Sequence, residues 1–376
     1  MRVLIVSVTA GYGHHASAKA VSDRLEHCGA RVLTVDLFKY ISKLLYDTID
    51  KGYLLSVKYA RKPYGQVYSA LETNRTLRRL SIANIATDTI ANRFLSYIEK
   101  FNPDVIVCTH VFPAMIMDEL KSRGRLSAVT IGIITDFTVH PFWDDVPNVE
   151  YIVVASELLT IRAKKHNIDP SRILPFGIPV QTKFTVSLDK AECRRELGIQ
   201  EDRNTVLIMG GSMGSGNIEK LVKDMHASGL GLTMLCVCGN NKKLRARLSA
   251  LEGRLPIKVY GFTDNVDVMM EASDCIVTKP GGLTVTEALC KKLPMILVNP
   301  LPGQEERNTE FLLNNGVAMN VTKSFPIGEA VFSMFSNNNR LRSIQEALIS
   351  VSKPNSTADL CNFILNLKKD DATPCR

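Results

Sequence analysis

Short apolar runs recur along the chain and are separated by longer segments with helical spacing of apolar residues. The runs cover residues 2 to 8, 31 to 35, 104 to 108, 128 to 134, 151 to 155, 205 to 209, 232 to 238, 257 to 260, 274 to 277 and 294 to 298. Such runs are typical of strands buried on both faces of a parallel sheet, and their alternation with helices predicts βαβ units. The pattern therefore predicts an α/β fold with doubly wound sheets.

Length and one crowded stretch predict two domains. A chain of 376 residues is longer than a single core usually serves. Pro175, Gly177 and Pro179 mark a stiff boundary after the fifth apolar run. We place the first domain at residues 1–177 and the second at 178–376, with helices and no strand signal from about 327 to 369.

Residues 38 to 100 interrupt the α/β rhythm and carry most of the net charge of +8. Residues 51 to 100 hold nine Lys or Arg and three acids, interleaved with Tyr and Leu. A basic, aromatic segment suits the surface of an anionic membrane, but solvated helix faces over an ordinary core have the same composition. Nucleic acid is a weaker interpretation, because no recognisable binding motif accompanies the charge.

The remaining composition excludes several classes of protein. The nine cysteines lie mostly inside apolar runs, which is typical of reduced core thiols, and no C-x-x-C pair indicates zinc. No stretch is long enough for a membrane span or resembles a signal peptide. Any membrane contact is therefore expected to be peripheral.

The segment from Thr278 to Leu289 predicts an anion site. A buried strand is stopped by Pro280, and Gly281 and Gly282 allow a ligand close to the backbone. The helix that opens near Leu283 points its N–H groups and positive dipole end at that place, which suits a diphosphate. Glu287, one turn later, can reach ribose hydroxyls. The alternative is a tight turn followed by a solvated first-turn carboxylate.

A second loop favours the ligand interpretation. Gln304 and Glu305 follow the next strand, so both loops are expected at the carboxyl edge of one sheet, where ligands of α/β folds bind. Their side chains suit sugar hydroxyls. Gly210, Gly211 and Ser212 form another glycine-rich loop after a core strand. This loop either faces a phosphate or sugar or is only a flexible connector. The Phe262 side chain either packs against a nucleotide base or fills part of the hydrophobic core.

The first half contributes candidate acid–base groups. His14 follows Gly13 at the carboxyl end of the first strand, where it is either a helix-entry residue or a base that takes a proton from a hydroxyl. Asp136 ends another strand, and His140 and Trp143 follow it, a combination suited to a sugar or lipid headgroup. His110 is interpreted as structural.

Taken together and in this order, these motifs resemble the diacylglycerol glycosyltransferases, which include monogalactosyldiacylglycerol synthases and bacterial processive diacylglycerol β-glucosyltransferases. The resemblance covers nearly the whole chain. It implies a GT-B fold, with two Rossmann-like domains facing across a cleft and the terminal helix, about residues 350–369, packed on the first domain. It also implies a UDP-sugar in the second domain and the lipid acceptor and membrane contact in the first.

The resemblance assigns roles to individual residues. His14 is similar to the general base, and Asp136 to its partner or to an alternative base. On the donor side the resemblance implies sugar, ribose, diphosphate and uracil contacts from Gly210, Gly211, Ser212, Phe262, Lys279, Pro280, Gly281, Gly282, Leu283, Thr284, Glu287, Gln304 and Glu305. On the acceptor side it implies Gly13, His140 and Trp143, with Tyr53, Arg61 and Tyr64 in the basic segment.

The expected reaction is an inverting transfer of a hexose from UDP-glucose or UDP-galactose to diacylglycerol. The loop at Lys279–Gly282 resembles that of the bacterial glucosyl enzymes more than that of the plant galactosyl enzymes, and this resemblance mildly favours glucose. No metal or other cofactor is expected, because the chain has no D-x-D triplet. The expected location is peripheral, at the cytoplasmic face of the cell membrane. Three alternatives remain: an N-acetylglucosaminyltransferase acting on an undecaprenyl-linked peptidoglycan precursor, a non-hydrolysing UDP-N-acetylglucosamine 2-epimerase, and a non-catalytic UDP-sugar sensor.

Overall fold

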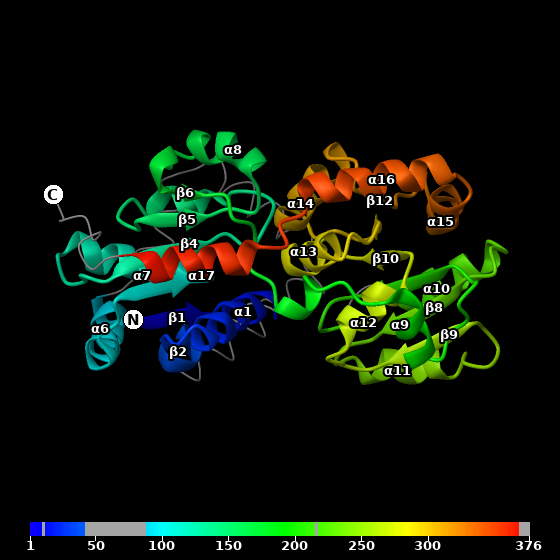
Figure 1. Ribbon diagram of the computed structural model, residues 1–376, viewed down its shortest axis with the longest axis horizontal. Coiled ribbons are helices and arrows are strands. Elements are labelled where there is room, and N and C mark those ends of the chain that lie inside the picture. The colour runs from blue at the N-terminus through cyan, green and yellow to red at the C-terminus, as the bar shows by residue number, and fades with distance from the viewer. Residues whose placement is uncertain (10–11, 42–87, 215–216, 368–376) are drawn as a thin grey trace. The chain divides into compact units, whose positions relative to one another are not determined.

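The computed structural model describes residues 1–9, 12–41, 88–214 and 217–367, which form two compact units. The first unit comprises Met1–Gln181, Leu301–Gln304 and Asn355–Arg376, and the second comprises Thr182–Pro300 and Glu305–Pro354. Within the described residues, each unit has one parallel sheet of six strands, covered by helices (Figure 1). None of the described helices is long and apolar enough to cross a membrane.

The sheet of the first unit has the strand order β2-β1-β3-β4-β5-β6. Its strands are β1 (Arg2–Ser7), β2 (Arg31–Asp36), β3 (Val105–Cys108), β4 (Val129–Ile133), β5 (Tyr151–Val153) and β6 (Ile173–Leu174). All neighbours are parallel, and β1 pairs with both β2 and β3. The chain therefore proceeds from β1 in one direction to β2 and then returns past β1 to β3, which makes the gap between β1 and β3 the topological switch point.

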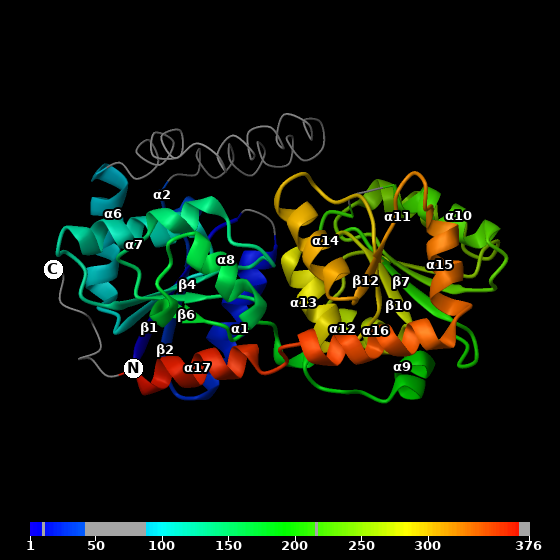
Figure 2. The same ribbon diagram turned by 90° about the horizontal axis from the view of Figure 1, so that it is seen from above.

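Helices cover both faces of this sheet (Figure 2). One face carries α1 (Gly13–His27) and α17 (Ser356–Asn366), and the other carries α6 (Asp88–Phe101) and α7 (Val111–Ser122). Shorter elements are α2 (Leu37–Ile41), η1 (Pro141–Asp145), η2 (Glu157–Leu159), α8 (Thr160–Lys165) and η3 (Pro170–Arg172). The carboxyl edge of the sheet is thus left to the loops that follow its strands.

The terminal helix α17 belongs to the core of the first unit. Leu360, Cys361 and Ile364 are fully buried in one hydrophobic cluster with residues of α1 and the sheet. Thr357 Oγ1 donates to the Val180 carbonyl at 2.7 Å and accepts from the Val180 N–H at 3.0 Å. These contacts hold α17 on the first unit, although Thr357 and Val180 are 177 residues apart in the sequence.

The sheet of the second unit has the order β12-β11-β10-β7-β8-β9. Its strands are β7 (Thr205–Met209), β8 (Thr233–Val237), β9 (Ile257–Tyr260), β10 (Cys275–Thr278), β11 (Met295–Leu297) and β12 (Ala318–Asn320). Its helical elements are η4 (Thr182–Phe184), α9 (Lys190–Glu196), α10 (Ile218–Ala227), α11 (Lys242–Ser249), α12 (Val266–Ala272), α13 (Gly282–Cys290), α14 (Gln304–Asn314), α15 (Ile327–Phe335) and α16 (Asn338–Val351). Here the switch point lies between β7 and β10.

All ten apolar runs form strands, and the doubly wound interpretation is confirmed. Two strands have no counterpart in the prediction, because β6 has only two residues and β12 lies in a stretch whose apolar run is interrupted by Asn320. The segment from 183 to 203 contains α9, in which Arg194 is buried. The hydrogen bonds of Arg194 explain its burial.

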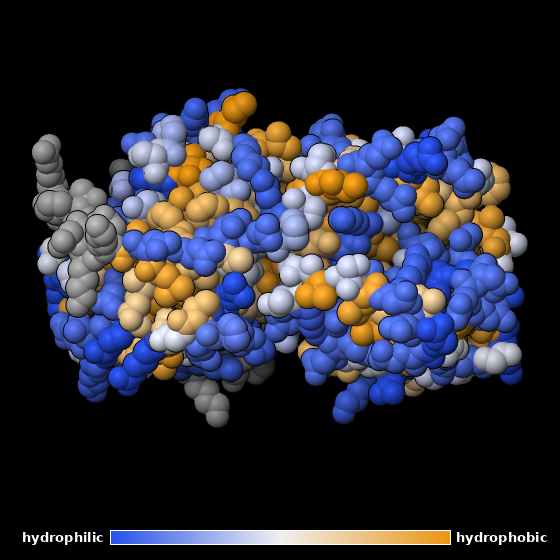
Figure 3. Space-filling view, in the orientation of Figure 1, coloured by the Kyte–Doolittle hydropathy of each residue, from blue (hydrophilic) through white to orange (hydrophobic). Residues whose placement is uncertain are grey.

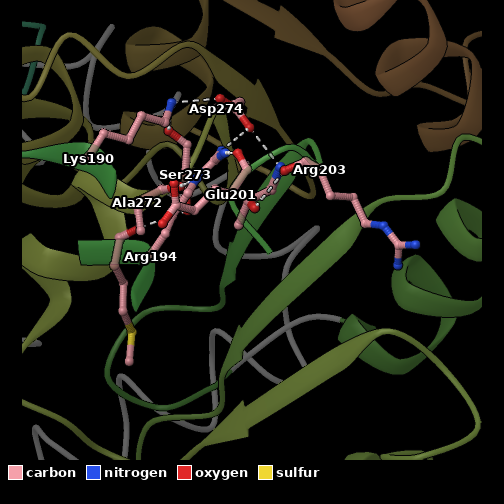
Figure 4. A network of polar contacts seen from close by, with 9 residues as sticks. Lys190, Arg194, Glu201, Arg203, Ala272, Ser273 and Asp274 are labelled. Carbon is pink, nitrogen blue, oxygen red and sulfur yellow. Dashed lines mark hydrogen bonds and ion pairs between the residues drawn. The ribbon is translucent and has the colours of Figure 1, made fainter. Parts of the chain in front are cut away.

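Asp274 and Arg194 are the centre of a polar network beneath the amino ends of β7 and β10 (Figure 4). Asp274 Oδ2 accepts from Arg194 Nη2 at 2.8 Å and from the Thr205 N–H at 2.7 Å. Its Oδ1 accepts from Lys190 Nζ at 2.6 Å. Arg194 Nε also donates to the Ala272 carbonyl at 3.0 Å. One carboxylate thus joins α9 to two central strands.

We expect Asp274→Ala to lower the free energy of unfolding of the second unit by about 2–4 kcal/mol. Removing the carboxylate leaves the nearly buried Arg194 guanidinium without its ion partner and the Thr205 N–H without an acceptor. Urea unfolding followed by circular dichroism measures the effect. Asp202→Ala, an exposed neighbour, is the control, and equal midpoints for the two variants would contradict the role of the network.

Candidate functional site

The candidate site of the first unit lies at the carboxyl ends of β1, β3 and β4. His14 is the second residue of α1, directly after the loop that leaves β1. Its Nδ1 lies 2.8 Å from the carbonyl oxygen of Thr109, which follows β3, and 3.2 Å from Oγ1 of Thr135, which follows β4. His14 therefore bridges the switch point of the sheet, where ligands of α/β folds bind.

The contact with Thr109 determines the tautomer of His14. A carbonyl oxygen only accepts hydrogen bonds, so Nδ1 carries the hydrogen and Nε2 keeps its lone pair. Burial is the main reason that the pKa of His14 is lowered to about 4, and the neighbouring His15 lowers it further. The hydrogen bond to Thr109 acts in the opposite direction and raises the pKa. The imidazole is therefore neutral near neutral pH, with Nε2 able to accept a proton.

Further aromatic rings surround His14 on the same edge. The His110 ring packs edge-on against the His14 ring, with centroids 4.7 Å apart and an interplanar angle of 86°. His110 also caps α7, because its Nδ1 accepts from the Phe112 N–H at 3.1 Å. Burial lowers the pKa of His110 well below its usual range, and the nearby His14 and His140 contribute to the lowering. His110 thus has the expected structural role and also contacts the candidate base.

His140 has a similar arrangement on the next loop. Its Nδ1 accepts from the Phe142 N–H at 3.2 Å and caps η1, and the rings of His140 and Phe142 lie 4.8 Å apart. The Phe112 and Phe142 rings are 6.5 Å apart, so the two capped turns are neighbours. His14, His110, Phe112, His140 and Phe142 are all half-buried and form an aromatic rim around the carboxyl edge.

The other candidate residues of the first unit do not all lie on the aromatic rim. Asp136 is half-buried and follows Thr135 directly. Gly13 begins α1. Trp143 is 5% exposed, and a Cβ at Gly132 of β4 would lie 2.4 Å from its ring, so the indole is core packing rather than rim. Tyr53, Arg61 and Tyr64 lie outside the described residues.

A hydrogen-bonded group beside His14 holds the start of α1 and was not predicted. Thr9 Oγ1 lies 2.7 Å from His15 Nε2 and donates to Asp36 Oδ2, which is 3.1 Å from His15 Nε2. Burial alone would raise the pKa of Asp36, but its hydrogen bonds to His15, Thr9 and the Lys39 N–H lower it. This group connects the ends of β1 and β2 to the helix that carries His14.

The candidate site of the second unit is at the corresponding edge. The loops after β10 and β11 lie side by side, since the two strands pair with Thr278 opposite Leu297. Helix α13 begins at Gly282, its N-cap Gly281 supplies no side-chain cap, and a Cβ added to Gly281 would meet nothing within 4 Å among the described residues. Leu283 and Thr284 continue the first turn of α13. This geometry suits an anion.

Two contacts join α14 to this turn. Lys279 Nζ is 3.2 Å from Glu305 Oε1, and both side chains are nearly buried. Asn308 is fully buried, and its Nδ2 donates to the Pro280 carbonyl at 2.9 Å. Glu305 and Gln304 are the first two residues of α14. The two predicted loops are therefore connected, and Asn308 is a supporting residue that the sequence pattern did not indicate.

Glu287 lies one turn into α13 and is half-buried. Burial raises its pKa to about 8, Lys183 opposes this effect and Asp267 adds to it. Lys183, in η4, donates to the Asp264 carbonyl and is 3.5 Å from Asp267 Oδ1. A carboxyl group whose proton is held this strongly is a common feature of ligand sites. Lys183 was not predicted, because it lies about a hundred residues before α13.

The remaining candidates follow the inner and outer strands of this sheet. Gly210, Gly211 and Ser212 follow β7, next to β10 across the switch point. Gly239 has a φ of +54°, and a Cβ there would lie 2.2 Å from the Ser212 carbonyl, so glycine is needed for these loops to pack. Phe262 follows β9 and is 48% exposed, which rules out a core-filling role.

Comparisons with known proteins agree with this architecture. The model of the monogalactosyldiacylglycerol (MGDG) synthase family matches residues 14–180, and that of the glycosyltransferase family 28 C-terminal domain matches residues 205–353. A probable monogalactosyldiacylglycerol synthase 3 of Oryza sativa is 31% identical, over 98% of this chain and 75% of the relative. A processive diacylglycerol β-glucosyltransferase of Bacillus subtilis is 28% identical, over 97% of this chain and 94% of the relative.

Solved structures support the same fold. Acinetobacter baumannii MurG matches with a TM-score of 0.64 and 16% identity, over 97% of this chain and 99% of that structure. At 16% identity this structural match is evidence for the fold and not for the function. The chain has the GT-B fold.

Proposed function

The chain belongs to the glycosyltransferase family that contains the monogalactosyldiacylglycerol synthases and the processive diacylglycerol β-glucosyltransferases, and on this premise we propose that it transfers a hexose from a UDP-sugar to diacylglycerol. Glucose is the preferred donor sugar in this proposal. The reaction is an inverting displacement and uses no resident metal. The products are UDP and a membrane glycolipid.

The observation that carries the proposal is the state of His14. With Nδ1–H bonded to the Thr109 carbonyl and a pKa near 4, the ring offers a neutral Nε2 to a hydroxyl. The acceptor oxygen attacks the anomeric carbon, its proton passes to Nε2, and the bond to the diphosphate breaks with its electron pair on UDP. General-base help of this kind typically contributes about 10²–10⁴ in rate.

The second unit supplies the donor side of this proposal. The diphosphate lies before the first turn of α13, where backbone N–H groups stabilise the charge that develops on the leaving group. Glu287 accepts hydrogen bonds from the ribose hydroxyls. Gln304 and Glu305 bind the sugar hydroxyls, and Phe262 lies against the uracil. This stabilisation by backbone dipoles is the reason that we propose turnover without a metal, and EDTA is expected to leave the rate unchanged.

The test uses the purified full chain with diacylglycerol in anionic vesicles and separate additions of UDP-glucose, UDP-galactose and UDP-N-acetylglucosamine. Mass spectrometry identifies the products, and proton NMR of the anomeric coupling constant reports inversion. Hexosyl-diacylglycerol from one donor supports the proposal. Transfer only to an undecaprenyl-linked acceptor, or UDP binding without any transfer, would overturn it in favour of another acceptor or a sensor.

We expect His110 to position the base through its ring. His110→Asn keeps a cap acceptor for the Phe112 N–H but removes the ring beside His14, so kcat should fall up to about tenfold at unchanged donor KM and stability. His110→Phe should show the reverse, with near-normal kcat and about 1 kcal/mol lower stability, because it keeps a ring and loses the cap. Steady-state kinetics and thermal unfolding of both variants decide, and normal turnover by His110→Asn would refute the positioning role.

A further inference from the structure

The guanidinium of Arg245 lies over the glycine that precedes Phe262. Arg245 is in the first turn of α11, which follows β8, and Gly261 directly follows the neighbouring strand β9. A Cβ added to Gly261 would lie 3.2 Å from Arg245 Nη1 and 3.6 Å from its Cζ. The φ of Gly261 is outside the left-handed region, so the backbone there suits any residue. The absent side chain at this position therefore leaves room for the guanidinium beside the loop.

Exposure and positive charge do not by themselves mark Arg245 as a ligand residue. Hydrophilic side chains, blue in Figure 3, cover much of the face of the second unit on which Figure 1 shows α9 and α16. Arg247, on the same helix, is also exposed and pairs with Glu219 at 2.9 Å. Within the part of the chain that the structure describes, the Arg245 side chain has no hydrogen bond or ion pair. Its donors are therefore available at the carboxyl edge, beside the exposed ring of Phe262.

The loop after β9 also approaches the candidate ribose residue, Glu287. Lys183 Nζ donates to the Asp264 carbonyl in this loop and lies 3.5 Å from Asp267 Oδ1 in α12. Lys183 and Asp267 both influence the pKa of Glu287, so they lie near its carboxyl group. Figure 2 shows α12 and α11 on opposite faces of the second sheet. The loop therefore has the surroundings of Glu287 on one side and Arg245 on the other.

A nucleotide that reaches from Glu287 across this loop brings the far edge of its base to Arg245. With the ribose hydroxyls at Glu287 and the base against Phe262, O4 is the uracil carbonyl that lies farthest from the ribose. A guanidinium only donates hydrogen bonds, so it matches this carbonyl and opposes the amino group that cytosine carries at the same carbon. Arginine recognises base carbonyls in this way in protein–DNA complexes. The arrangement can therefore distinguish uracil from cytosine.

We propose that Arg245 determines base specificity by donating a hydrogen bond to O4 of the donor's uracil. This inference rests on the proposed function, which places a UDP-sugar in the second unit, and it assigns the recognition of the base to a side chain of α11. An arginine that only attracted the diphosphate would strengthen the binding of every nucleoside diphosphate equally. The comparison of uridine with cytidine nucleotides therefore decides between the two roles.

The first test is calorimetric binding of UDP and CDP to the purified full chain. The wild type should bind UDP about 10–10² more tightly, because CDP leaves a charged donor facing an amino group. Arg245→Ala should lose about 10–10² in affinity for UDP and little for CDP, so that the two affinities become nearly equal. Arg245→Lys keeps the charge without the planar fork and should retain part of the selectivity. Arg247→Ala is the matched control on the same helix and should bind both nucleotides normally.

The second test displaces the guanidinium without removing it. In Gly261→Ala the new Cβ would lie 3.2 Å from the flexible end of Arg245, which should move aside at little cost in stability. Affinity for UDP should fall about threefold to tenfold, and affinity for CDP should not change. In Arg245→Ala/Gly261→Ala the second substitution should add nothing, because no guanidinium remains to be displaced. UDP with sulfur in place of O4, a weaker acceptor, should bind the wild type less tightly than UDP and bind Arg245→Ala as UDP does.

The binding measurements need no acceptor and are therefore independent of sugar transfer. Equal affinities of the wild type for UDP and CDP, an equal loss for both nucleotides in Arg245→Ala, or additive losses in the double variant would each overturn the proposal. If the wild type selects UDP through Arg245 but transfers no hexose to diacylglycerol, the proposed function fails and the inference stands. If the wild type transfers hexose and Arg245→Ala keeps the wild-type selectivity for UDP, only the inference fails.

Discussion

His14→Ala is expected to lower kcat for sugar transfer by about 10²–10⁴ while UDP binding stays at the wild-type level. The variant removes Nε2, which is the proposed proton acceptor. Nε2 keeps its lone pair because Nδ1 carries the hydrogen that is donated to the Thr109 carbonyl. Nothing in the second unit changes, so calorimetric binding of UDP should be unaffected. Single-turnover and steady-state rates with saturating donor and acceptor measure the loss.

Two further variants separate base chemistry from local structure. His14→Asn keeps an N–H for the Thr109 carbonyl and lacks the base, so it should be as inactive as His14→Ala. His27→Ala changes an exposed histidine at the other end of the same helix and should be fully active. If His14→Asn retains wild-type turnover, the base is another group, and Asp136→Asn becomes the decisive variant.

The pH dependence gives an independent check on His14. A histidine with its pKa lowered to about 4 stays neutral between about pH 6 and about pH 8, whereas an ordinary imidazole gains a proton in this range. His14 should therefore cause no loss of activity on acidification from pH 8 to pH 6. An acid limb near pH 6.5 that disappears in His14→Asn would contradict the half-buried, neutral imidazole.

Local sequence pattern was sufficient for most of the fold. The ten predicted strands were recognisable because each lies in a short stretch rich in apolar residues, and several of the loops after them were recognisable by glycine and proline. The short strands β6 and β12 form only through pairing with β5 and β11, a tertiary contact that leaves no periodic signal. The burial of Arg194 could not be predicted from local pattern, because its partner Asp274 is 80 residues away.

The candidate site was predictable in its residues but not in its contacts. The spacing of glycine, histidine and carboxylates indicated His14, Glu287 and the turn before α13. The partner of His14 is the backbone carbonyl of Thr109, which any residue could supply, so the sequence cannot indicate it. Trp143 shows the opposite case, since its residue type suggested a ligand contact and the structure shows its indole buried against Gly132.

Glu287→Ala is expected to weaken UDP-sugar binding by about 10–10² with little change in kcat. A carboxylate that accepts two ribose hydroxyls makes charge-assisted hydrogen bonds, each contributing about 1.5–3 kcal/mol, partly offset by the cost of removing its proton. Glu287→Gln should lose about tenfold, because an amide offers a single acceptor oxygen. Glu329→Gln, an exposed carboxylate on α15, is the matched control.

The raised pKa of Glu287 makes donor binding dependent on pH. With a pKa of about 8 in the ligand-free protein, the carboxyl is mostly protonated at pH 7, and the ribose hydroxyls favour the charged form. Binding of UDP at pH 7 should therefore release about one proton, and donor affinity should rise until the pH passes about 8. Calorimetry in two buffers of different ionisation enthalpy measures the proton count, which should fall toward zero in Glu287→Gln.

The same group should reduce the stability of the ligand-free protein. An acid whose pKa is raised on folding favours the folded state below its ordinary pKa, and that stability is lost as the pH rises from about 4.5 to about 8. Glu287→Gln removes this loss, so at pH 8 the ligand-free variant should be more stable than the wild type by about 2 kcal/mol after allowance for partial exposure. A variant that binds donor weakly and is also no more stable would show that Glu287 is an ordinary solvated carboxylate. A gain in stability together with the loss of proton release would instead show that the fold keeps a costly, desolvated carboxyl for its ligand.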